Sequence, residues 1–347
     1  MPLTRRSVLS TLAGTAASAA FLAKFSPAQK TASPTAADES SPHDPLRPSF
    51  HYLPARNWIN DPCAPVFFRG QYHLFHQYNP NAAVWGDMHW SHATSPDMVH
   101  WKRLPVALAP SPTGPNEASS PDSAGCFTGS ALFGNGRPAI IYTGVQTVPH
   151  EQATLSDGAH NFRETQLLAT SSDPGLRTWR KHPQPVIPAP PPGLHVTGFR
   201  DPAPFQFAGS QYLAVGSGQR GIGGMVLLYR ARRLPDGTAD LTQWEYLHPL
   251  AQEAAGTSPA PSTSPARRDP VDTGEMWECP DFFPLGNRHV LIYSTRRQTL
   301  WQVGDLDPRT LRFHPTASGQ LDFGRSFYAP KTQLDEHGNR ILWGWLN

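Results

Sequence analysis

Three acidic residues stand at similar places in repeating stretches of the sequence. Asp61, Asp201 and Glu278 precede short apolar runs, and they lie nine, eight and eight residues before the glycine of the following turn. If these carboxylates converge, they cannot all be ionised without repulsion, so one of them should have a raised pKa and keep its proton. A carboxylate beside a protonated carboxylic acid is the pair of groups that cleaves glycosidic bonds. The competing use of clustered acids is a Ca²⁺ or Mg²⁺ site.

The acids lie just before three copies of a segment that recurs five times along the chain. Each copy has an apolar strand, a turn containing glycine and a second apolar strand, which is the pattern of a β-hairpin. The copies span residues 66–75, 130–142, 204–215, 281–293 and 331–345. Four of them continue into a third strand and a turn that leads to an aromatic residue. Repeats of roughly 50–75 residues with three or four strands each are typical of a β-propeller, and a generic β-sandwich would not produce this repeated order.

We therefore predict an all-β fold, a five-bladed β-propeller, over residues 49–347. Equivalent strand ends meet around the central channel of a propeller, so the three acids should converge there. The fifth repeat stops after its second strand. We expect its blade to be incomplete, unless a strand near residues 50–53 helps to close the ring. We also expect no C-terminal β-sandwich in this chain.

The first 48 residues differ in composition from the repeats. Arg5 and Arg6 precede a mildly apolar run, Leu12 to Ala23, that is too short to span a bilayer as a helix. This arrangement is similar to a bacterial twin-arginine signal, and a disordered tail is the alternative. We predict a signal segment at residues 1–30 and a flexible linker at 31–48. The expected location is the periplasm or the cell exterior, without stable membrane insertion.

Composition excludes several other classes of protein. The net charge is +2, and the 29 basic residues form no run, so nothing indicates binding to nucleic acid or to an anionic membrane. Glycine (28) and proline (38) favour short strands and many turns. Cys63, Cys126 and Cys279 cannot all pair and form no C-x-x-C zinc pattern, so we expect free thiols without a catalytic role. The oligomeric state is left open.

Several side chains near the acids could bind a sugar. Amide and guanidinium groups would bond to hydroxyls, and tryptophan rings would supply stacking faces. The second repeat carries no acid at the equivalent point and offers an aromatic and a hydroxyl side chain instead. The substrate-binding candidates are Trp58, Asn60, Gln77, Trp85, Phe127, Thr128 and Arg200.

Three short motifs carry a resemblance to a known family. Residues 58–62 (Trp-Ile-Asn-Asp-Pro) resemble the W-M-N-D-P-N-G motif of glycoside hydrolase family 32, the invertases, inulinases, levanases and fructan hydrolases. Residues 200–202 match its R-D-P motif, and residues 278–279 match its E-C motif. The likeness runs from about Phe50 to Asn347. The chain departs from the family pattern at Cys63-Ala64, which replaces Asn-Gly, and the family's C-terminal β-sandwich is expected to be absent from it.

The resemblance implies a retaining glycoside hydrolase that releases fructose from sucrose or from β-fructans such as inulin and levan. Asp61 would be the nucleophile that forms a covalent fructosyl-enzyme, and Glu278 would be the general acid and then the base. Asp201 would bind hydroxyls of the fructose ring. Retention requires the carboxyl groups of nucleophile and acid to lie roughly 5–5.5 Å apart. No metal or organic cofactor is implied.

Two other functions are compatible with the same residues. A fructosyltransferase would pass the covalent intermediate to a sugar instead of to water. A non-catalytic propeller that binds carbohydrate is the alternative from another class, and the Cys63-Ala64 replacement motivates it. An arabinan-cleaving relative fits less well, because the first motif and the E-C motif match the fructosidase pattern.

Overall fold

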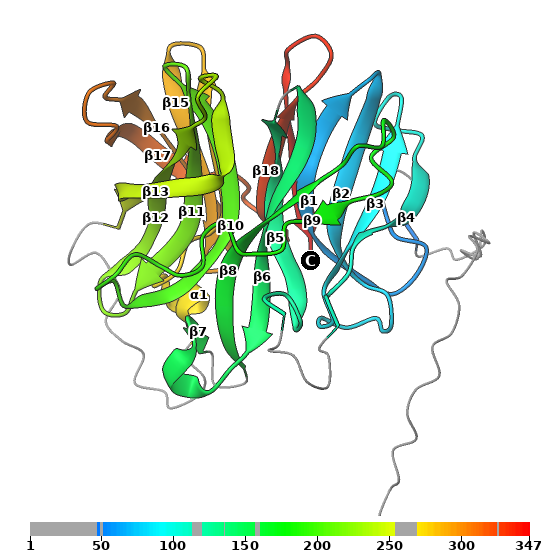
Figure 1. Ribbon diagram of the computed structural model, residues 1–347, viewed down its shortest axis with the longest axis horizontal. Helices are drawn as coiled ribbons and strands as arrows, with labels where there is room; N and C mark the ends of the chain where they lie inside the picture. The colour runs from blue at the N-terminus through cyan, green and yellow to red at the C-terminus, as the bar shows by residue number, and fades with distance from the viewer. Residues whose placement is uncertain are drawn as a thin grey trace, which may run out of the picture. The chain divides into compact units, whose positions relative to one another are not determined.

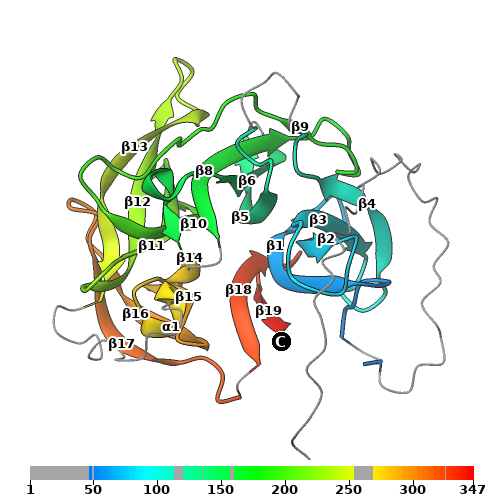
Figure 2. The same cartoon turned by 90° about the horizontal axis from the view of Figure 1, so that it is seen from below.

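The computed structural model describes residues 47–48, 51–112, 120–134, 136–156, 160–253, 269–324 and 326–347. The predicted signal segment and nearly all of the predicted linker lie outside these residues. The unit Ser40–Asn347 is all-β in its long elements, with antiparallel sheets arranged around a centre (Figures 1 and 2). Among the described residues, no helix is long and apolar enough to cross a membrane.

Four sheets form blades of four or five strands. The first consists of β1 (Trp58–Phe68), β2 (Gln71–Asn79), β3 (His89–Ser95) and β4 (Lys102–Leu108). The second consists of β5 (Gly125–Gly134), β6 (Arg137–Thr147), β8 (Asn161–Thr170), β7 (Leu155–Ser156) and β9 (Arg180–Lys181). The third consists of β10 (Val196–Phe207), β11 (Ser210–Gln219), β12 (Gly223–Arg233) and β13 (Ala239–Gln252). The fourth consists of β14 (Glu278–Leu285), β15 (Arg288–Thr295), β16 (Gln298–Leu306) and β17 (Phe313–Gln320).

The fifth repeat forms a two-stranded sheet of β18 (Phe327–Leu334) and β19 (Arg340–Leu346). The propeller was therefore predicted correctly, but the count of five blades was wrong, because only four sheets have the strands of a full blade. Residues 51–54 form no strand, so the proposed closure near residues 50–53 is not observed in its described part. No β-sandwich domain is present among the described residues.

The first strand of each sheet faces the centre and contacts its neighbours. β1, β5, β10, β14 and β18 lie nearest the middle of Figure 2, and each contacts the first strands of the adjacent sheets. A β-bulge interrupts the pairing of every one of these strands with the next strand of its sheet. In four of them, a residue with positive φ precedes a proline at the bulge: Ala64, Asp201, Cys279 and Ala329. Proline cannot donate to the ladder, and a bulge re-aims the neighbouring side chains.

The positions of the bulges show that the three acids are not equivalent, although they lie at similar distances from the turn glycines. Asp201 is itself the positive-φ residue of its bulge, Glu278 lies one residue before the corresponding Cys279, and Asp61 lies three before Ala64. The acids are therefore not at equivalent positions of the repeat. The distance from the turn glycine does not reveal this difference, because the number of residues between the bulge and the turn varies from strand to strand.

Apolar faces of neighbouring blades pack together and hold the inner strands in place. Between the first and second blades, Phe75 and Trp90 pack with Ile140 and Tyr142, all at most 1% exposed. Similar clusters join the second blade to the third and the third to the fourth. Since protein interiors are close-packed, the bulges cannot shift without disturbing these interfaces.

Three histidines are buried in the first blade. Nδ1 of His73 lies 3.0 Å from Nε2 of His92, whose ring stacks on Phe75 with a centroid distance of 4.1 Å. Burial lowers the pKa of His73 and of His76 to about 4, and it also lowers the pKa of His92. These rings are therefore neutral in the folded protein near neutral pH.

We expect this histidine cluster to make the fold sensitive to acid. The unfolded chain binds protons at these sites near pH 6.5, whereas the folded protein binds them only near pH 4, so stability is full above pH 6.5 and is lost as pH falls toward 4. For His76 alone the effect is about 3 kcal/mol. Urea unfolding between pH 7.5 and 5 measures it. His76→Gln should flatten the pH dependence and the exposed control His100→Gln should not; a wild-type curve without slope below pH 6.5 would contradict the prediction.

Candidate active site

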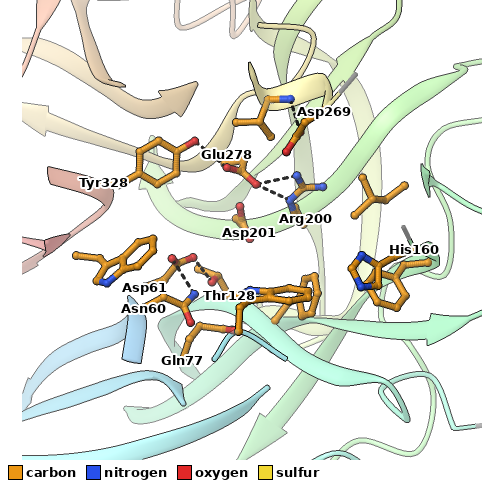
Figure 3. A pocket seen from close by; sticks show the side chains of 16 residues that line it. Asn60, Asp61, Gln77, Thr128, His160, Arg200, Asp201, Asp269, Glu278 and Tyr328 are labelled. Carbon is orange, nitrogen blue, oxygen red and sulfur yellow. Dashed lines mark hydrogen bonds and ion pairs between the residues drawn. The ribbon is translucent and has the colours of Figure 1, made fainter. Parts of the chain in front are cut away.

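A central cavity of about 330 Å³ contains the three predicted acids. Asp61, Asp201 and Glu278 all line it, although they come from three different blades (Figure 3). Six of the seven predicted binding residues also line this cavity: Asn60, Gln77, Trp85, Phe127, Thr128 and Arg200. Trp58 does not line it; its Nε1 donates to Oδ1 of Asn60 at 2.8 Å instead. The tertiary structure thus brings the predicted acids together and gives Trp58 a supporting contact.

The carboxylate of Asp61 is held only by neutral hydrogen-bond donors. Asn60 Nδ2 donates to one oxygen at 3.1 Å, and Thr128 Oγ1 donates to the other at 2.5 Å. The thiol of Cys279 lies 3.4 Å from that second oxygen. No ion pair joins Asp61 to a basic side chain within the described residues. The donors therefore orient the carboxylate and leave its charge uncancelled.

Glu278 is held by an arginine and a tyrosine. Nη2 of Arg200 donates to Oε1 at 2.7 Å, and the hydroxyl of Tyr328 donates to Oε2 at 2.8 Å. Glu278 keeps 21% of its side chain exposed, so it faces the cavity while both of its oxygens are fixed. Tyr328 was not among the predicted site residues, although Tyr328-Ala329-Pro330 occupies the equivalent point of the fifth repeat.

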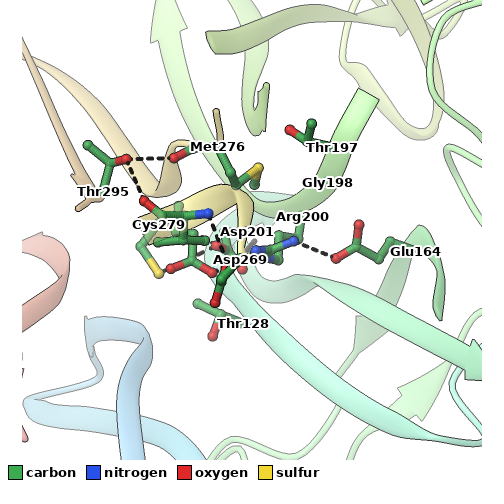
Figure 4. Close-up of polar contacts among 12 residues, drawn as sticks. Thr128, Glu164, Thr197, Gly198, Arg200, Asp201, Asp269, Met276, Cys279 and Thr295 are labelled. Atoms are coloured by element: carbon green, nitrogen blue, oxygen red, sulfur yellow. Dashed lines mark hydrogen bonds and ion pairs between the residues drawn. The ribbon is translucent and has the colours of Figure 1, made fainter. Parts of the chain in front are cut away.

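Arg200 also pairs with a carboxylate that sequence reasoning missed. Its Nη1 donates to Oε1 of Glu164 at 2.9 Å, and Glu164 is completely buried on β8 (Figure 4). Burial alone would lower the pKa of Arg200, but Glu164 and Glu278 outweigh it and hold the pKa well above its usual value. The backbone N–H of Phe199 donates to the other oxygen of Glu164 at 2.6 Å. The sequence signal that could have revealed Glu164 was an acidic residue in the middle of the third strand of the second repeat.

Asp201 is the acid whose pKa is raised. It is 3% exposed, and burial raises its pKa to about 7, helped by Glu278 and Asp61 and opposed by Arg200. The backbone N–H of Cys279 donates to its Oδ2 at 2.8 Å (Figure 4). The raised pKa expected for one of the acids thus belongs to Asp201, the buried carboxyl at the β10 bulge.

Comparison with known proteins places this arrangement in a family. Residues 51–347 match the glycosyl hydrolases family 32 N-terminal domain. The chain belongs to glycosyl hydrolase family 32.

Relatives agree with this assignment at the level of sequence and fold. The raffinose invertase of Escherichia coli is 37% identical over 314 residues, which are 86% of this chain and 57% of that protein. A β-fructofuranosidase of Bombyx mori is 32% identical with a TM-score of 0.67, covering 87% of this chain and 57% of that one. Fructan 1-exohydrolase IIa of Cichorium intybus is 31% identical with a TM-score of 0.68, covering 87% and 54%. The chain thus spans slightly more than half the length of these relatives.

This family 32 chain places its unusual Cys63-Ala64 pair behind the acids. Both residues are completely buried, and the thiol of Cys63 lies 3.5 Å from the carbonyl oxygen of Asp61. Ala64 has a φ of 44°, a conformation that favours glycine, which the family motif has at this point. The replacement therefore keeps the bulge but adds a methyl group in a strained conformation, and it places no side chain in the cavity.

An aromatic wall borders the cavity of this family 32 domain on the side of the second blade. The ring of Trp85 lies 5.8 Å from Phe127 and 5.5 Å from His160, and His160 stacks on Phe162 at 5.0 Å. Trp85 is 44% exposed, so it can offer a face to a ligand. Residues that line the cavity and were not predicted are Leu155, His160, Phe162, Asp269, Val271, Tyr328 and Trp345.

The donor set does not resemble a metal site. Among the described residues, no group of three or more His, Cys, Asp or Glu side chains is arranged to hold a metal ion.

The three cysteines are free and buried. Burial raises the pKa of Cys279 well above its usual value, so its thiol stays protonated and acts as a donor toward Asp61 and Asp201. A thiol predicted to have no catalytic role thus has a structural place in the family 32 site.

The raised pKa of Asp201 predicts how an asparagine replacement behaves. A carboxyl with a folded pKa of about 7 and an unfolded value near 3.8 contributes stability at low pH that is lost as pH rises toward 7. Asp201→Asn removes this titration, so the stability of the variant relative to wild type should rise from pH 5 to pH 7 by about 1.4 kcal/mol per pH unit and then level off. Urea unfolding at pH 5 and 8 measures the difference. A pH-independent difference would contradict the prediction.

Proposed function

We propose that this chain carries the catalytic domain of a retaining β-fructofuranosidase that releases fructose from sucrose or β-fructans. The observation that carries the proposal is the meeting of Asp61, Asp201 and Glu278 in one cavity of a family 32 domain. Relatives named raffinose invertase and sucrose-6-phosphate hydrolase support it. Related structures include a Bombyx mori β-fructofuranosidase variant with sucrose and a Cichorium intybus exohydrolase variant with 1-kestose.

In the first step, Asp61 attacks the anomeric carbon of the fructosyl unit. A bond forms between its carboxylate oxygen and that carbon, and the bond to the leaving oxygen breaks. Glu278 transfers its proton to the leaving oxygen, so the departing sugar leaves as a neutral alcohol. The neutral donors around Asp61 support this role, because they position the oxygen without an ion pair that would reduce its nucleophilicity.

In the second step, water cleaves the ester between the fructosyl unit and Asp61. Glu278, now ionised, takes a proton from the water, whose oxygen bonds to the anomeric carbon as the Asp61 carboxylate departs. Arg200 and Tyr328 hold the two oxygens of Glu278 through both steps. Because two displacements occur on opposite faces, fructose leaves with its original configuration.

Asp201 and the aromatic wall would bind the two sides of the substrate. With a pKa of about 7, Asp201 can donate or accept hydrogen bonds with fructose hydroxyls near neutral pH. Trp85, whose ring contacts Phe127 and His160, can stack on a sugar ring of the leaving group. The choice between sucrose and longer fructans would depend on this wall.

We also propose that the two-stranded sheet of β18 and β19 fills the gap between the first and fourth blades. β18 contacts both β1 and β14, and it has the same bulge as the inner strands of the other sheets. This placement would close the ring around the cavity.

Product analysis tests the proposed function. Purified protein is incubated with sucrose, inulin and levan, and free glucose and fructose are measured. NMR of the first fructose released reports its anomeric configuration. Equal glucose and fructose from sucrose with retention support the hydrolase; glucose in excess of fructose at high sucrose indicates transfer. Binding of sucrose by calorimetry without any product would show a non-catalytic propeller and overturn the proposal.

A further inference from the structure

A buried lysine lies behind the acids of the site. Lys331 on β18 is 2% exposed and is among the largest fully buried side chains of the described residues. Lysine is almost never fully buried unless it is paired. The ammonium group of Lys331 donates to the carbonyl oxygen of Pro280 at 3.1 Å, and it forms no ion pair with a described carboxylate within 4.0 Å. So costly a placement calls for a role beyond packing.

Lys331 donates its hydrogen bond to the β14 bulge, whose Cys279 contacts Asp61 and Asp201. Pro280 directly follows Cys279 at the bulge of β14. The N–H of Cys279 donates to Asp201, and its thiol lies within 3.5 Å of an oxygen of Asp201 and of an oxygen of Asp61. Lys331 therefore holds the backbone that places these donors.

The site has more carboxyl groups than cationic groups. Asp61, Asp201, Asp269 and Glu278 line the cavity, and the buried Glu164 lies beside Arg200. Arg200 already pairs with Glu164 and Glu278. Burial raises the pKa of Asp201, and the positive charge of Lys331 opposes that rise, as it does for the thiol of Cys279. The ammonium group thus acts on the carboxyl that Arg200 only partly compensates.

We propose that Lys331 is a positioning residue of the active site, which holds the Cys279-Pro280 bulge and supplies a buried positive charge that acts on Asp201. This inference rests on the proposed function. The charge favours the ionised form of Asp201. The titratable groups on which the charge of Lys331 acts are Cys63, Asp201 and Cys279.

Two substitutions separate the charge of Lys331 from its hydrogen bond. Lys331→Met keeps the length of the side chain and removes both, whereas Lys331→Gln removes the charge and keeps a donor. We expect both to lower kcat by about tenfold or more with little change in KM, because substrate does not contact this residue. Both should move the acidic limb of the pH–rate profile to higher pH by about one unit, since loss of a cation disfavours ionised carboxylates.

A core substitution without charge change provides the matched control. Ile140→Val removes one methyl group from a completely buried side chain in the second blade and changes no charge. It should lower Tm and leave the pH–rate profile in place. If the profiles of both Lys331 variants superimpose on that of wild type, Lys331 is a packing residue and the inference is overturned.

A second measurement does not depend on activity. If the ammonium group stabilises ionised carboxylates, the difference in unfolding free energy between wild type and either Lys331 variant should widen from pH 6 to pH 8.5. A difference that stays constant with pH would show only a lost hydrogen bond and would contradict the charge role. Absence of fructose release by wild type would overturn the proposed function, while this unfolding experiment would still judge Lys331.

Discussion

Replacing Asp61 with asparagine should reduce fructose release by at least about 10⁴-fold, because the amide cannot form the ester on which both steps depend. Asparagine has nearly the same size, and the cavity is otherwise unchanged, so sucrose binding measured by calorimetry should persist. Wild-type protein quenched with acid during turnover should carry the mass of one fructosyl unit. The Asp61→Asn variant should not.

An exposed aspartate gives the control for this experiment. Asp305 on β16 has 59% of its side chain exposed and pairs with Arg288 at the surface. Asp305→Asn makes the same chemical change far from the cavity, and surface pairs of this kind contribute little to stability. It should retain wild-type activity. An Asp61→Asn protein that releases fructose at more than a tenth of the wild-type rate would rule out Asp61 as the nucleophile.

Glu278→Gln should produce the second large loss, and its size should depend on the leaving group. General acid catalysis contributes about 10²–10⁴-fold, so hydrolysis of sucrose should fall by that factor. A nitrophenyl β-fructofuranoside has a leaving group that departs without a proton, so formation of its intermediate should be much less affected. Azide, which needs no general base, should restore turnover and yield a fructosyl azide.

The hydrogen bonds of Glu278 require that the stability of the glutamine variant be measured together with its rates. Glutamine can accept from Arg200 or from Tyr328 through its one carbonyl oxygen, and its amide group then faces the other of these two donors. Some loss of stability is therefore expected, and Tm should be measured alongside the rates. Glu245→Gln, at an exposed pair with Arg230, is the matched control. Equal losses with sucrose and with the nitrophenyl substrate would show that Glu278 is not the proton donor.

Local patterns were sufficient to predict most of the architecture. Alternating apolar residues and glycine turns define each hairpin, and these signals depend on neighbours only a few residues apart. The recurrence of the hairpin indicated a propeller, and a propeller brings strand ends to one centre. For this reason Asp61, Asp201 and Glu278 could be predicted to meet although long stretches of sequence separate them.

The register of the acids and their surroundings could not be predicted in this way. Bulges at Ala64, Asp201 and Cys279 shift each acid relative to its turn, and the lengths between bulge and turn differ. The number of blades depends on how many strands join the sheet of the fifth repeat. The hairpin pattern of that repeat does not specify this number. Trp58, chosen as a stacking face, contacts Asn60 instead of the cavity.

The sequence by itself therefore determined the strand pattern, the fold class and the three acids, because each is encoded by residues close together in the chain. Only the tertiary structure decided which acid has a raised pKa and which buried charges surround it. Asp201 has a raised pKa because other blades bury it, Glu164 reaches Arg200 from β8, and Lys331 approaches from β18. Desolvation and Coulomb interactions act through space, and their sum depends on packing between segments that no local pattern connects.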